Sequence, residues 1–463
     1  MGLLPLTYTR PKHVPQESFS MVSIVTTDDG GSDKETLPRS DGSVRSGQSG
    51  QSGIPDSLTF DRIINGGTCP PMTLRDFMNY LVYIEHSAEN LQFFLWYKDY
   101  CRRFEAIPAS EKALAPEWTL AMHEDTVAKI RKVTVDKRRP EVEVAQQIFK
   151  GTDFDKQAGE ALSPPSHLNM ADHQPFHTPP DSRHSEQTTC YAPSSTAGTG
   201  TTDYKAQASD AFHSAGARQP FTIQPFRDEI NRVIATYIMY SSPRQLNLSS
   251  WEQKATVQAL SQTTHPTALR GLVKSVESSL RGQSHPNFVR WSICNGNPAR
   301  VTFARGLGLF LIVAGFAMAV VLTLSSLGRG YRALAAIAWV LGISTLMAAW
   351  KGMCVVLHGL HHRHIRPWEL FEQDDASMAA EEKLSKGSFE SFGSSNSYED
   401  EPWVVKYQKR NVVRKIFDRE IWVQEPALRQ IQDTIFVQAL LSGALGGGLL
   451  TLVFVLVPGP KLF

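Results

Sequence analysis

Three apolar runs near the C-terminus constrain this chain more than any other feature of its 463 residues. Gly306–Leu327 and Thr434–Val457 hold 22 and 24 residues without a charged side chain. Ala333–Trp350 holds 18, and it extends to Leu357 where the ammonium group of Lys351 reaches the polar interface. An α-helix needs about 20 apolar residues to cross the hydrocarbon core. We therefore expect three membrane-spanning helices, although the second run also fits a buried helix of a soluble domain. The expected spans are 303–327, 333–357 and 434–457.

The charges around these runs predict a membrane orientation. Basic residues are concentrated between the second and third runs, in the loop 358–432, whereas only Lys461 follows the third run. By the positive-inside tendency this loop is cytosolic, a preference that Arg329 and Arg332 in the first short turn oppose. Three crossings then put the N-terminal domain in the cytosol. We expect a multi-pass integral membrane protein of the plasma membrane.

The rest of the chain predicts an all-α fold interrupted by segments of low complexity. Residues 1–54 are rich in Ser, Gly, Thr and Asp, and residues 151–219 in Pro, Ser, Thr, Gly and His. Neither segment can bury enough apolar surface to offset the entropy of ordering. We expect 1–54 to be disordered and 151–219 to be a flexible insertion that splits a helical domain into 55–150 and 220–298. In the second part, an apolar stripe at helical spacing runs over Leu269–Leu280.

Composition argues against several classes of function. The net charge of +1 gives the chain no polyanion-binding character, so we expect no nucleic-acid partner. Five scattered cysteines argue against a disulfide framework or a zinc site, and we expect no metal and no cofactor. The cluster His361–His364 follows the second run closely. A metal site is one interpretation of it, but among arginines it is more typical of a basic anchor that binds anionic lipid.

The stretch from Leu74 to Phe104 predicts two helices joined by an acidic elbow. Apolar residues at i, i+3, i+4 and i+7 from Leu74 predict an amphipathic helix. The elbow is Glu85–Asn90, with the sequence Glu-His-Ser-Ala-Glu-Asn. The residues from Leu91 to Phe104 are apolar on almost every face, which is typical of a helix in the middle of a bundle. An elbow held between two such helices points carboxylates and amides outward, as a docking surface does.

Three separated stretches together resemble the RGS family, the helical domains that regulate G-protein signalling. The elbow, followed by two aromatic residues, resembles the signature of this family. Ser242–Ser249 resembles its second loop, and Gln283–Phe288 resembles its last turn facing the Gα subunit. The resemblance implies an RGS-like helical bundle that the insertion interrupts. Together with the C-terminal spans, the arrangement is similar to a fungal group of membrane-anchored RGS proteins.

The resemblance implies a regulator with no active site of its own, and therefore not an enzyme. Such a domain binds the α subunit of a heterotrimeric G protein and accelerates GTP hydrolysis by holding the mobile switch loops in their transition-state arrangement. A neutral amide such as that of Asn247 suits this role, because it donates and accepts hydrogen bonds without adding charge. The residues that the resemblance assigns to the Gα contact are Glu85, Ser87, Glu89, Asn90, Asn247, Leu248 and Ser284.

Departures from the family pattern favour a second interpretation. Ser249 stands where the family carries an Asp, and Gln283 and Asn287 replace charged residues in the last turn. Each lost hydrogen bond to a charged group would cost about 1.5–3 kcal/mol of binding. A non-catalytic membrane adaptor for Gα or for cell-polarity factors is therefore the main alternative to a GTPase activator.

Further alternatives concern the elbow and the spans. In an unrelated helical bundle, Ser87 would be an ordinary helix cap and Asn247 the start of a helix. A transport role is disfavoured because, apart from Lys351, the apolar runs contain no charged residue to line an ion pathway. Gly443 and Gly447 form a small-xxx-small spacing in the third run, which predicts helix association and allows a homo-oligomer.

Overall fold

The computed structural model describes residues 13–15, 54–133, 202–221, 223–240, 242, 244–355, 361–370 and 402–458. These residues are mostly helical, as predicted, with a single two-stranded antiparallel sheet among them. They form two compact units. The first unit combines the chain up to Arg102 with the chain from Leu272 onward, and the second unit is Arg103–Gly271. The predicted disordered segment 1–54 lies almost entirely outside the described residues.

The first unit contains the short helices around the elbow and the three long helices of the apolar runs. The short helices are η1 (Asp56–Leu58), α3 (Phe60–Ile64), α4 (Leu74–Tyr80), η2 (Leu81–Glu85), α5 (Ala88–Ala106), α12 (Arg270–Ser279), η5 (Leu280–Ser284) and α13 (His285–Ile293), of which α5 and α12 continue into the second unit. The remaining elements are α14 (Pro298–Leu324), η6 (Arg329–Leu334), α15 (Ala335–Trp350), β1 (His362–His364), α19 (Pro402–Gln408), α20 (Val412–Ile416), β2 (Glu420–Trp422) and α21 (Pro426–Leu456).

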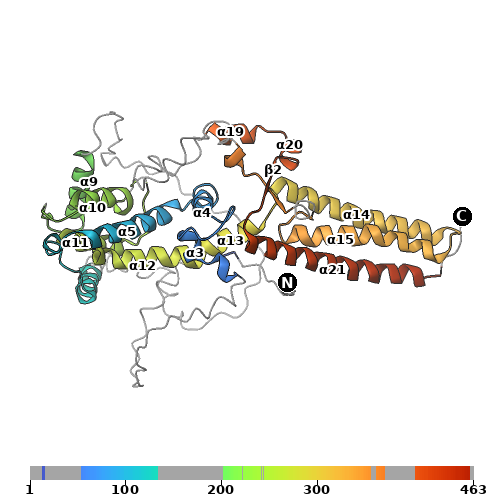
Figure 1. Ribbon diagram of the computed structural model, residues 1–463, viewed down its shortest axis with the longest axis horizontal. Helices are drawn as coiled ribbons and strands as arrows, with labels where there is room; N and C mark the ends of the chain where they lie inside the picture. Colours follow the sequence, from blue (N-terminus) through green and yellow to red (C-terminus); the bar gives the residue numbers. More distant parts are fainter. Residues whose placement is uncertain are drawn as a thin grey trace, which may run out of the picture. The chain divides into compact units, whose positions relative to one another are not determined.

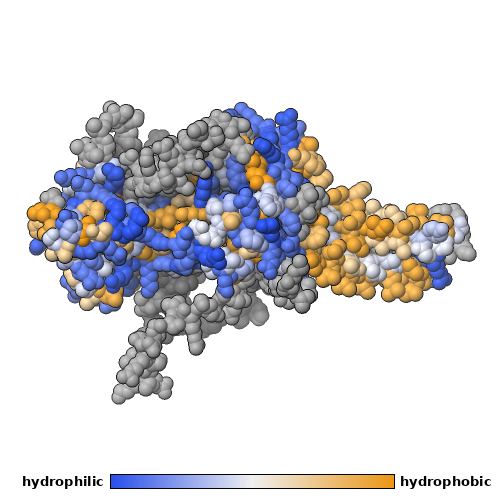
Figure 2. Space-filling view, in the orientation of Figure 1, coloured by the Kyte–Doolittle hydropathy of each residue, from blue (hydrophilic) through white to orange (hydrophobic). Residues whose placement is uncertain are grey.

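Three helical stretches among the described residues are long and apolar enough to cross a membrane: α14, η6 with α15, and α21. They lie side by side, with α15 in contact with both of the others (Figure 1). Figure 2 shows a hydrophobic surface over them, to which exposed leucines such as Leu309, Leu341 and Leu445 contribute. Water solvates such a surface poorly, whereas lipid chains cover it at no cost. The surface is consistent with a membrane protein.

Glycines let the third long helix approach the second. A Cβ atom at Gly443 of α21 would collide with the Oγ atom of Ser344 in α15. One turn further on, a Cβ atom at Gly447 would lie 2.7 Å from the side chain of Val340. Small residues at such positions allow close backbone packing between membrane helices. The small-xxx-small spacing is therefore covered by α15 of the same chain, and a homo-oligomer through the spans stays a prediction.

Arg332, in the η6 turn between the first two long helices, caps both neighbouring helices. Its guanidinium group donates to the carbonyl oxygens of Phe454 and Val457 at the end of α21, at 3.0 and 2.6 Å, and to that of Thr323 at the end of α14, at 3.3 Å. The last carbonyls of a helix have no partner within the helix, and in lipid each of them needs one. This capping role accounts for a buried arginine in the turn.

The predicted limits of the long helices need three corrections. The second helix ends at Trp350, before the predicted limit at 357, because Lys351 begins a turn in which Gly352 has a φ of 81°. The third helix begins at Pro426 rather than at 434, and the side chain of Glu425 caps its first turn. The first helix begins at Pro298 rather than at 303. Apolar runs mark the part of a helix that lies in lipid, whereas caps mark its ends.

The second unit contains a helix inside the predicted insertion. Its elements are α6 (Ala109–Lys112), helical residues 120–133, α9 (Thr202–Ser214), α10 (Arg227–Val233), η3 (Ile234–Ile238), α11 (Ser250–Gln262) and η4 (Pro266–Leu269). The predicted limit of the insertion at 219 is wrong, because α9 is regular and buries Ala208, Ala211 and Phe212 at helical spacing. Alanine is a weak hydrophobic signal, so composition alone hides this stripe. Residues 151–201 of the predicted insertion lie outside the described residues.

The described parts of the predicted cytosolic loop 358–432, residues 361–370 and 402–432, pack against other parts of the first unit. Strand β1 pairs antiparallel with β2, with His362 opposite Trp422. The main-chain amide of His364 donates to the carbonyl of Asn295, just after α13, at 2.8 Å. The sheet therefore attaches the loop to the short helices of the first unit.

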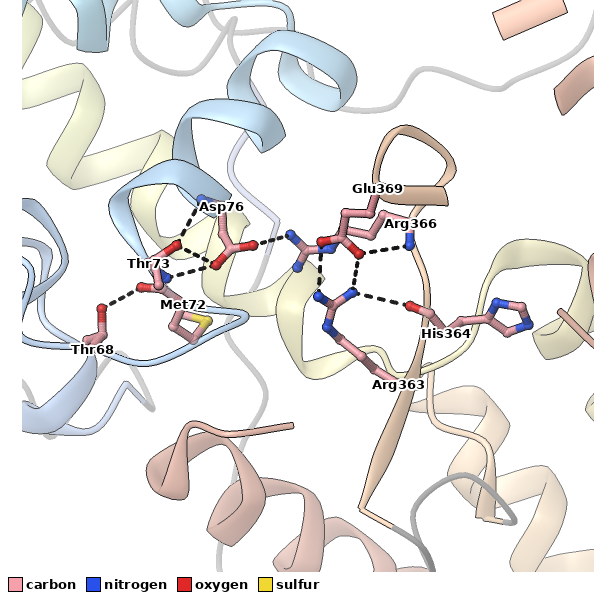
Figure 3. Close-up of polar contacts among 8 residues, drawn as sticks. All are labelled: Thr68, Met72, Thr73, Asp76, Arg363, His364, Arg366 and Glu369. Atoms are coloured by element: carbon pink, nitrogen blue, oxygen red, sulfur yellow. Dashed lines mark hydrogen bonds and ion pairs between the residues drawn. The ribbon is translucent and has the colours of Figure 1, made fainter. Parts of the chain in front are cut away.

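Two arginines of this segment are buried among acids. Arg363 and Arg366 are each 7% exposed, and Figure 3 shows both guanidinium groups directed at carboxylates. Arg363 donates to both oxygens of Glu369 at 2.9 Å, and Arg366 lies 3.2 Å from the carboxylate of Asp76 in α4. Arg363 therefore does not bind lipid, because its charge is neutralised inside the protein. The interpretation of His361–His364 as a lipid anchor is wrong at this residue.

Candidate partner-docking site

The elbow and the last of the three resembling stretches meet within the first unit. Ser284, at the end of η5, donates a hydrogen bond from its hydroxyl to the carboxylate of Glu85, with 2.6 Å between the oxygens. Ser87 donates to the same oxygen of Glu85 over 3.4 Å. Both serines are buried and Glu85 is half-buried. Two hydroxyl groups from different elements therefore hold the Glu85 carboxylate in one orientation.

The chain changes direction at the elbow, where an α-helix passes into a π-helical turn and then ends. Helix α4 continues into the π-helical turn η2, and His86 after it has a left-handed conformation with φ of 55° and ψ of 41°. The amide of Ser87 donates back to the carbonyl of Leu81 at 3.0 Å. A left-handed residue with such a backward hydrogen bond is a common way for a helix to end and the chain to change direction. The elbow is a hydrogen-bonded corner, and α5 begins directly after it.

Aromatic rings fill the space behind the elbow. Phe288 of α13 contacts Phe77 and Tyr80, with ring centroids 4.9 and 5.5 Å apart. Tyr80 also contacts Trp291, at 5.1 Å. Such ring pairs contribute about 0.5–1.5 kcal/mol each beyond the area that they bury. Their packing fixes α4 and η2 against α13, which keeps the elbow next to η5.

Arg366 and Trp368, which follow strand β1, pack against the helices that form the elbow. Tyr83 of η2 stacks on Trp368 with ring centroids 4.8 Å apart, and Trp368 stacks on Trp291 at 6.0 Å. The guanidinium group of Arg366 lies 4.1 Å from the centroid of the Trp291 ring while it pairs with Asp76. Sequence reasoning missed this support, because Arg366 and Asp76 are 290 positions apart.

Glu89 and Asn90 lie in the first turn of α5 with half-exposed side chains. An acidic group there also interacts favourably with the positive end of the helix dipole. Both side chains are accessible to a partner. Ser87, in contrast, is 4% exposed, so its contribution is to the shape of the elbow rather than to a broad contact surface.

Asn247 and Leu248 lie in the second unit, in the segment between η3 and α11. The side chain of Asn247 is exposed and that of Leu248 is half-buried. The preceding Leu246 is 1% exposed, and its amide donates to the carbonyl of Tyr237 at 2.9 Å. The loop is thus fixed directly before Asn247, which presents its amide to solvent.

Ser249 is the N-cap of α11. Its hydroxyl accepts from the amide of Glu252, whose carboxylate in turn accepts from the Ser249 amide at 2.9 Å, so the two form a capping box. Serine and aspartate are about equally good N-caps. The departure from the family pattern at Ser249 therefore preserves the local structure. Helix α11 begins after Ser249, so Asn247 is not its first residue.

The other two departures are buried. Gln283 and Asn287 are 5% and 3% exposed. The side-chain amide of Asn287 pairs with the backbone of Val14, whose amide donates to Oδ1 and whose carbonyl accepts from Nδ2, both at 3.0 Å. Sequence reasoning missed Val14, because the low complexity of the N-terminal segment as a whole conceals a short stretch with a specific contact.

Burial changes the titration of two side chains behind the site. Burial, together with the charge and hydrogen bond of Glu85, raises the pKa of the Tyr80 phenol above its ordinary value. Burial lowers the pKa of His285 to about 4 although its Nε2 atom lies 2.8 Å from the carbonyl oxygen of Leu58. Both side chains are therefore neutral at neutral pH, and neither adds charge to the site.

No protein-family model, curated protein or solved structure matches this chain in the comparisons. Within the described residues, no group of three or more His, Cys, Asp or Glu side chains is placed to hold a metal ion. The functional assignment therefore depends on the resemblance carried by the sequence and on the geometry of the elbow.

Proposed function

We propose that this chain is a membrane-anchored regulator of heterotrimeric G proteins, which binds the Gα subunit and accelerates its GTP hydrolysis. One observation carries the proposal. The hydrogen bond of 2.6 Å between Ser284 and Glu85 joins two stretches, 199 positions apart, that separately resemble Gα-facing segments of the RGS family. A chance resemblance in either stretch gives no reason for the two to meet.

The accessible side chains suit a partner that does its own chemistry. Glu89 offers a carboxylate, and Asn90 and Asn247 offer neutral amides. Such groups hold a partner's loops by hydrogen bonds and take no covalent part in the reaction. In a G protein the slow step depends on a glutamine that orients the attacking water and on mobile switch loops. Holding these loops in place lowers the barrier by preorganisation.

The rigidity of the elbow supports this mechanism. The Glu85 carboxylate is held by two hydroxyls, and the rings behind the elbow are packed against α13. A surface that is ordered before binding loses little entropy when it binds. More of the interaction free energy is then available to order the switch loops of Gα.

The long helices would place the docking site next to a partner that lies on the inner membrane surface. Sharing one surface raises the effective concentration of the two proteins. We infer that the short helices of the first unit are cytosolic, at the plasma membrane. The capping role of Arg332 removes one of the two charges that oppose this orientation, because that arginine closes two helix ends.

A non-catalytic adaptor is the second candidate, and one observation favours it. Asn287, in the stretch that resembles the last Gα-facing turn, is occupied by Val14. A site whose edge is already filled binds a partner with fewer contacts. An adaptor would bind Gα without preferring the transition-state form.

Binding to Gα in defined nucleotide states tests the proposal. The full chain in lipid nanodiscs would be titrated with Gα carrying GDP, a non-hydrolysable GTP analogue, or GDP with aluminium fluoride, which mimics the transferring phosphoryl group. We expect the tightest binding to the aluminium fluoride form, and a loss of about tenfold or more in affinity with Asn90→Ala or Asn247→Ala. Ser278→Ala, at an exposed position of α12, is the control and should bind as the wild type does.

The adaptor predicts equal affinity for all nucleotide states. Absence of binding to every form of every Gα tested would overturn both candidates.

A further inference from the structure

The α13 end of the docking site is in contact with the chain's own N-terminal segment. His13–Pro15 is described by the structure, with His13 and Pro15 exposed and Val14 half-buried. Val14 makes both of its backbone hydrogen bonds to the amide of Asn287, over 273 positions of sequence. The contact is reciprocal, since each partner donates once and accepts once.

We propose that His13–Pro15 is an intramolecular ligand of the docking site, which covers the Asn287 edge and competes with Gα. The inhibitory part of this inference rests on the proposed function, whereas the contact itself does not. The ligand that the site recognises is an extended peptide backbone.

The chemistry of Asn287 fits an extended backbone. A side-chain amide offers one donor and one acceptor side by side, which is the pattern that a residue in an antiparallel strand presents to its neighbour. Asn287 therefore replaces a strand neighbour for Val14. A charged residue at this position, as in the family pattern, offers only acceptors or only donors and could not make the reciprocal pair.

The position of the contact implies competition. Ser284 and Asn287 are three residues apart at the start of α13, and residues at this spacing share one helix face. A segment bound to Asn287 therefore lies about one helical turn from the Ser284–Glu85 pair. A stable protein interface covers roughly 800 Å² on each partner. A Gα subunit centred on the elbow would need the surface that His13–Pro15 covers.

Two variants separate the contact from the fold. Asn287→Ala removes the donor and the acceptor on α13. Val14→Pro removes the backbone N–H of residue 14 and leaves every residue of the helices unchanged, so it serves if Asn287→Ala fails to fold. His13→Ala alters an exposed neighbour and keeps the backbone of Val14, so it is the matched control.

The contact is measured without any partner. Hydrogen exchange of the full chain in nanodiscs should show a protected amide in the peptide that contains Val14. We expect Asn287→Ala to speed its exchange by about tenfold or more, since an amide without its hydrogen bond exchanges nearly freely, and His13→Ala to leave it unchanged. Equal exchange in the wild type and in Asn287→Ala would overturn the inference at once.

The inhibition is measured with Gα carrying GDP and aluminium fluoride. We expect Val14→Pro and Asn287→Ala to bind it about three- to tenfold more tightly than the wild type, because a site that is mostly occupied in cis loses affinity in proportion to the free fraction. His13→Ala should bind as the wild type does. Unchanged or weaker affinity in Val14→Pro, with protection of the Val14 amide lost in Asn287→Ala, would overturn the inhibitory role.

Absence of Gα binding in every variant would overturn the proposed function and the inhibitory role together. The exchange data would then decide the Val14 contact alone, so the two failures are distinguishable.

Discussion

Ser284 donates a hydrogen bond to the carboxylate of Glu85 over 2.6 Å, and this contact joins η5 to the turn before α5. It is a hydrogen bond to a charged group, of the stronger kind in proteins. It lies at the border of a buried aromatic cluster, so its geometry is fixed by the packing of Phe77 on Phe288. The packing of the aromatic core therefore determines the geometry of the elbow in the proposed docking surface.

Removal of this contact should weaken partner binding more than it weakens the fold. Ser284→Ala removes the shortest hydrogen bond that the structure gives the half-buried Glu85 carboxylate, so we expect a loss of about 1.5–3 kcal/mol in the free energy of unfolding and a lower affinity for Gα. Thermal unfolding and Gα titration of the full chain would measure the two effects. Ser278→Ala should change neither. A wild-type affinity in Ser284→Ala would show that the elbow is not part of the Gα contact.

The Arg366–Asp76 pair should matter far more for stability than a surface pair does. Both side chains are buried, and Arg366 also lies over the ring of Trp291. Arg366→Ala leaves the Asp76 charge buried without its partner, and such losses cost about 3–5 kcal/mol.

Arg102→Ala is the matched control, because Arg102 pairs with Asp99 while its side chain is 81% exposed. It should cost about 1 kcal/mol or less. Chemical unfolding of the full chain in detergent would compare the two variants. Equal losses would contradict the burial of Arg366.

His285 should make the protein less stable in mild acid. Burial lowers its pKa from an ordinary 6.5 to about 4, so the unfolded chain takes up a proton at a higher pH than the folded chain does. The contribution of His285 to the free energy of unfolding is fully present above pH 6.5. It falls as the pH drops toward 4, and about 2 kcal/mol of it is lost at pH 5.

The matched variant is His285→Gln, which keeps a donor for the Leu58 carbonyl but does not titrate. The difference in melting temperature between wild type and variant, followed from pH 7.5 to 5, isolates the contribution of His285. A constant difference over this range would contradict a buried neutral histidine.

The third long helix should tolerate alanine at one glycine and not at another. A Cβ atom at Gly443 would collide with Ser344 and with the backbone of Val340, whereas one at Gly448 would meet no atom within 4 Å. We expect Gly443→Ala to destabilise the bundle by about 1–3 kcal/mol and Gly448→Ala to be neutral or slightly stabilising. Thermal aggregation of the full chain in detergent would rank the variants. The reverse order would refute the packing of α21 on α15.

Local patterns predicted the parts of the fold that depend on neighbours in sequence. The apolar stripe of Leu269–Leu280 is buried along its length, and each of the three apolar runs lies for the most part in one of the three long helical stretches. Helical periodicity is a local signal, because i, i+3 and i+4 share a face in any helix. The association of Gly443 with a neighbouring helix followed from its spacing for the same reason.

Contacts between distant segments could not be predicted in this way. Nothing in the sequence near Arg366 indicates that it pairs with Asp76, and nothing near Val14 indicates Asn287. The basic cluster His361–His364 is an example. A run of His and Arg is ordinarily exposed, but in strand β1 Arg363 pairs with the carboxylate of Glu369 inside the protein. The prediction missed helix α9 for another reason: its buried stripe is mostly alanine, which gives a weak hydrophobic signal.

Single-turnover GTP hydrolysis tests the central claim most directly. Purified Gα loaded with GTP would be mixed with the full chain in nanodiscs, as wild type, as Asn247→Ala and as Ser278→Ala. The account predicts that the wild type and Ser278→Ala accelerate hydrolysis, and that Asn247→Ala loses most of the acceleration while it keeps the wild-type melting temperature, because the Asn247 side chain is exposed. Hydrolysis at the intrinsic rate of Gα with the wild-type chain, for every Gα that it binds, would contradict a GTPase activator.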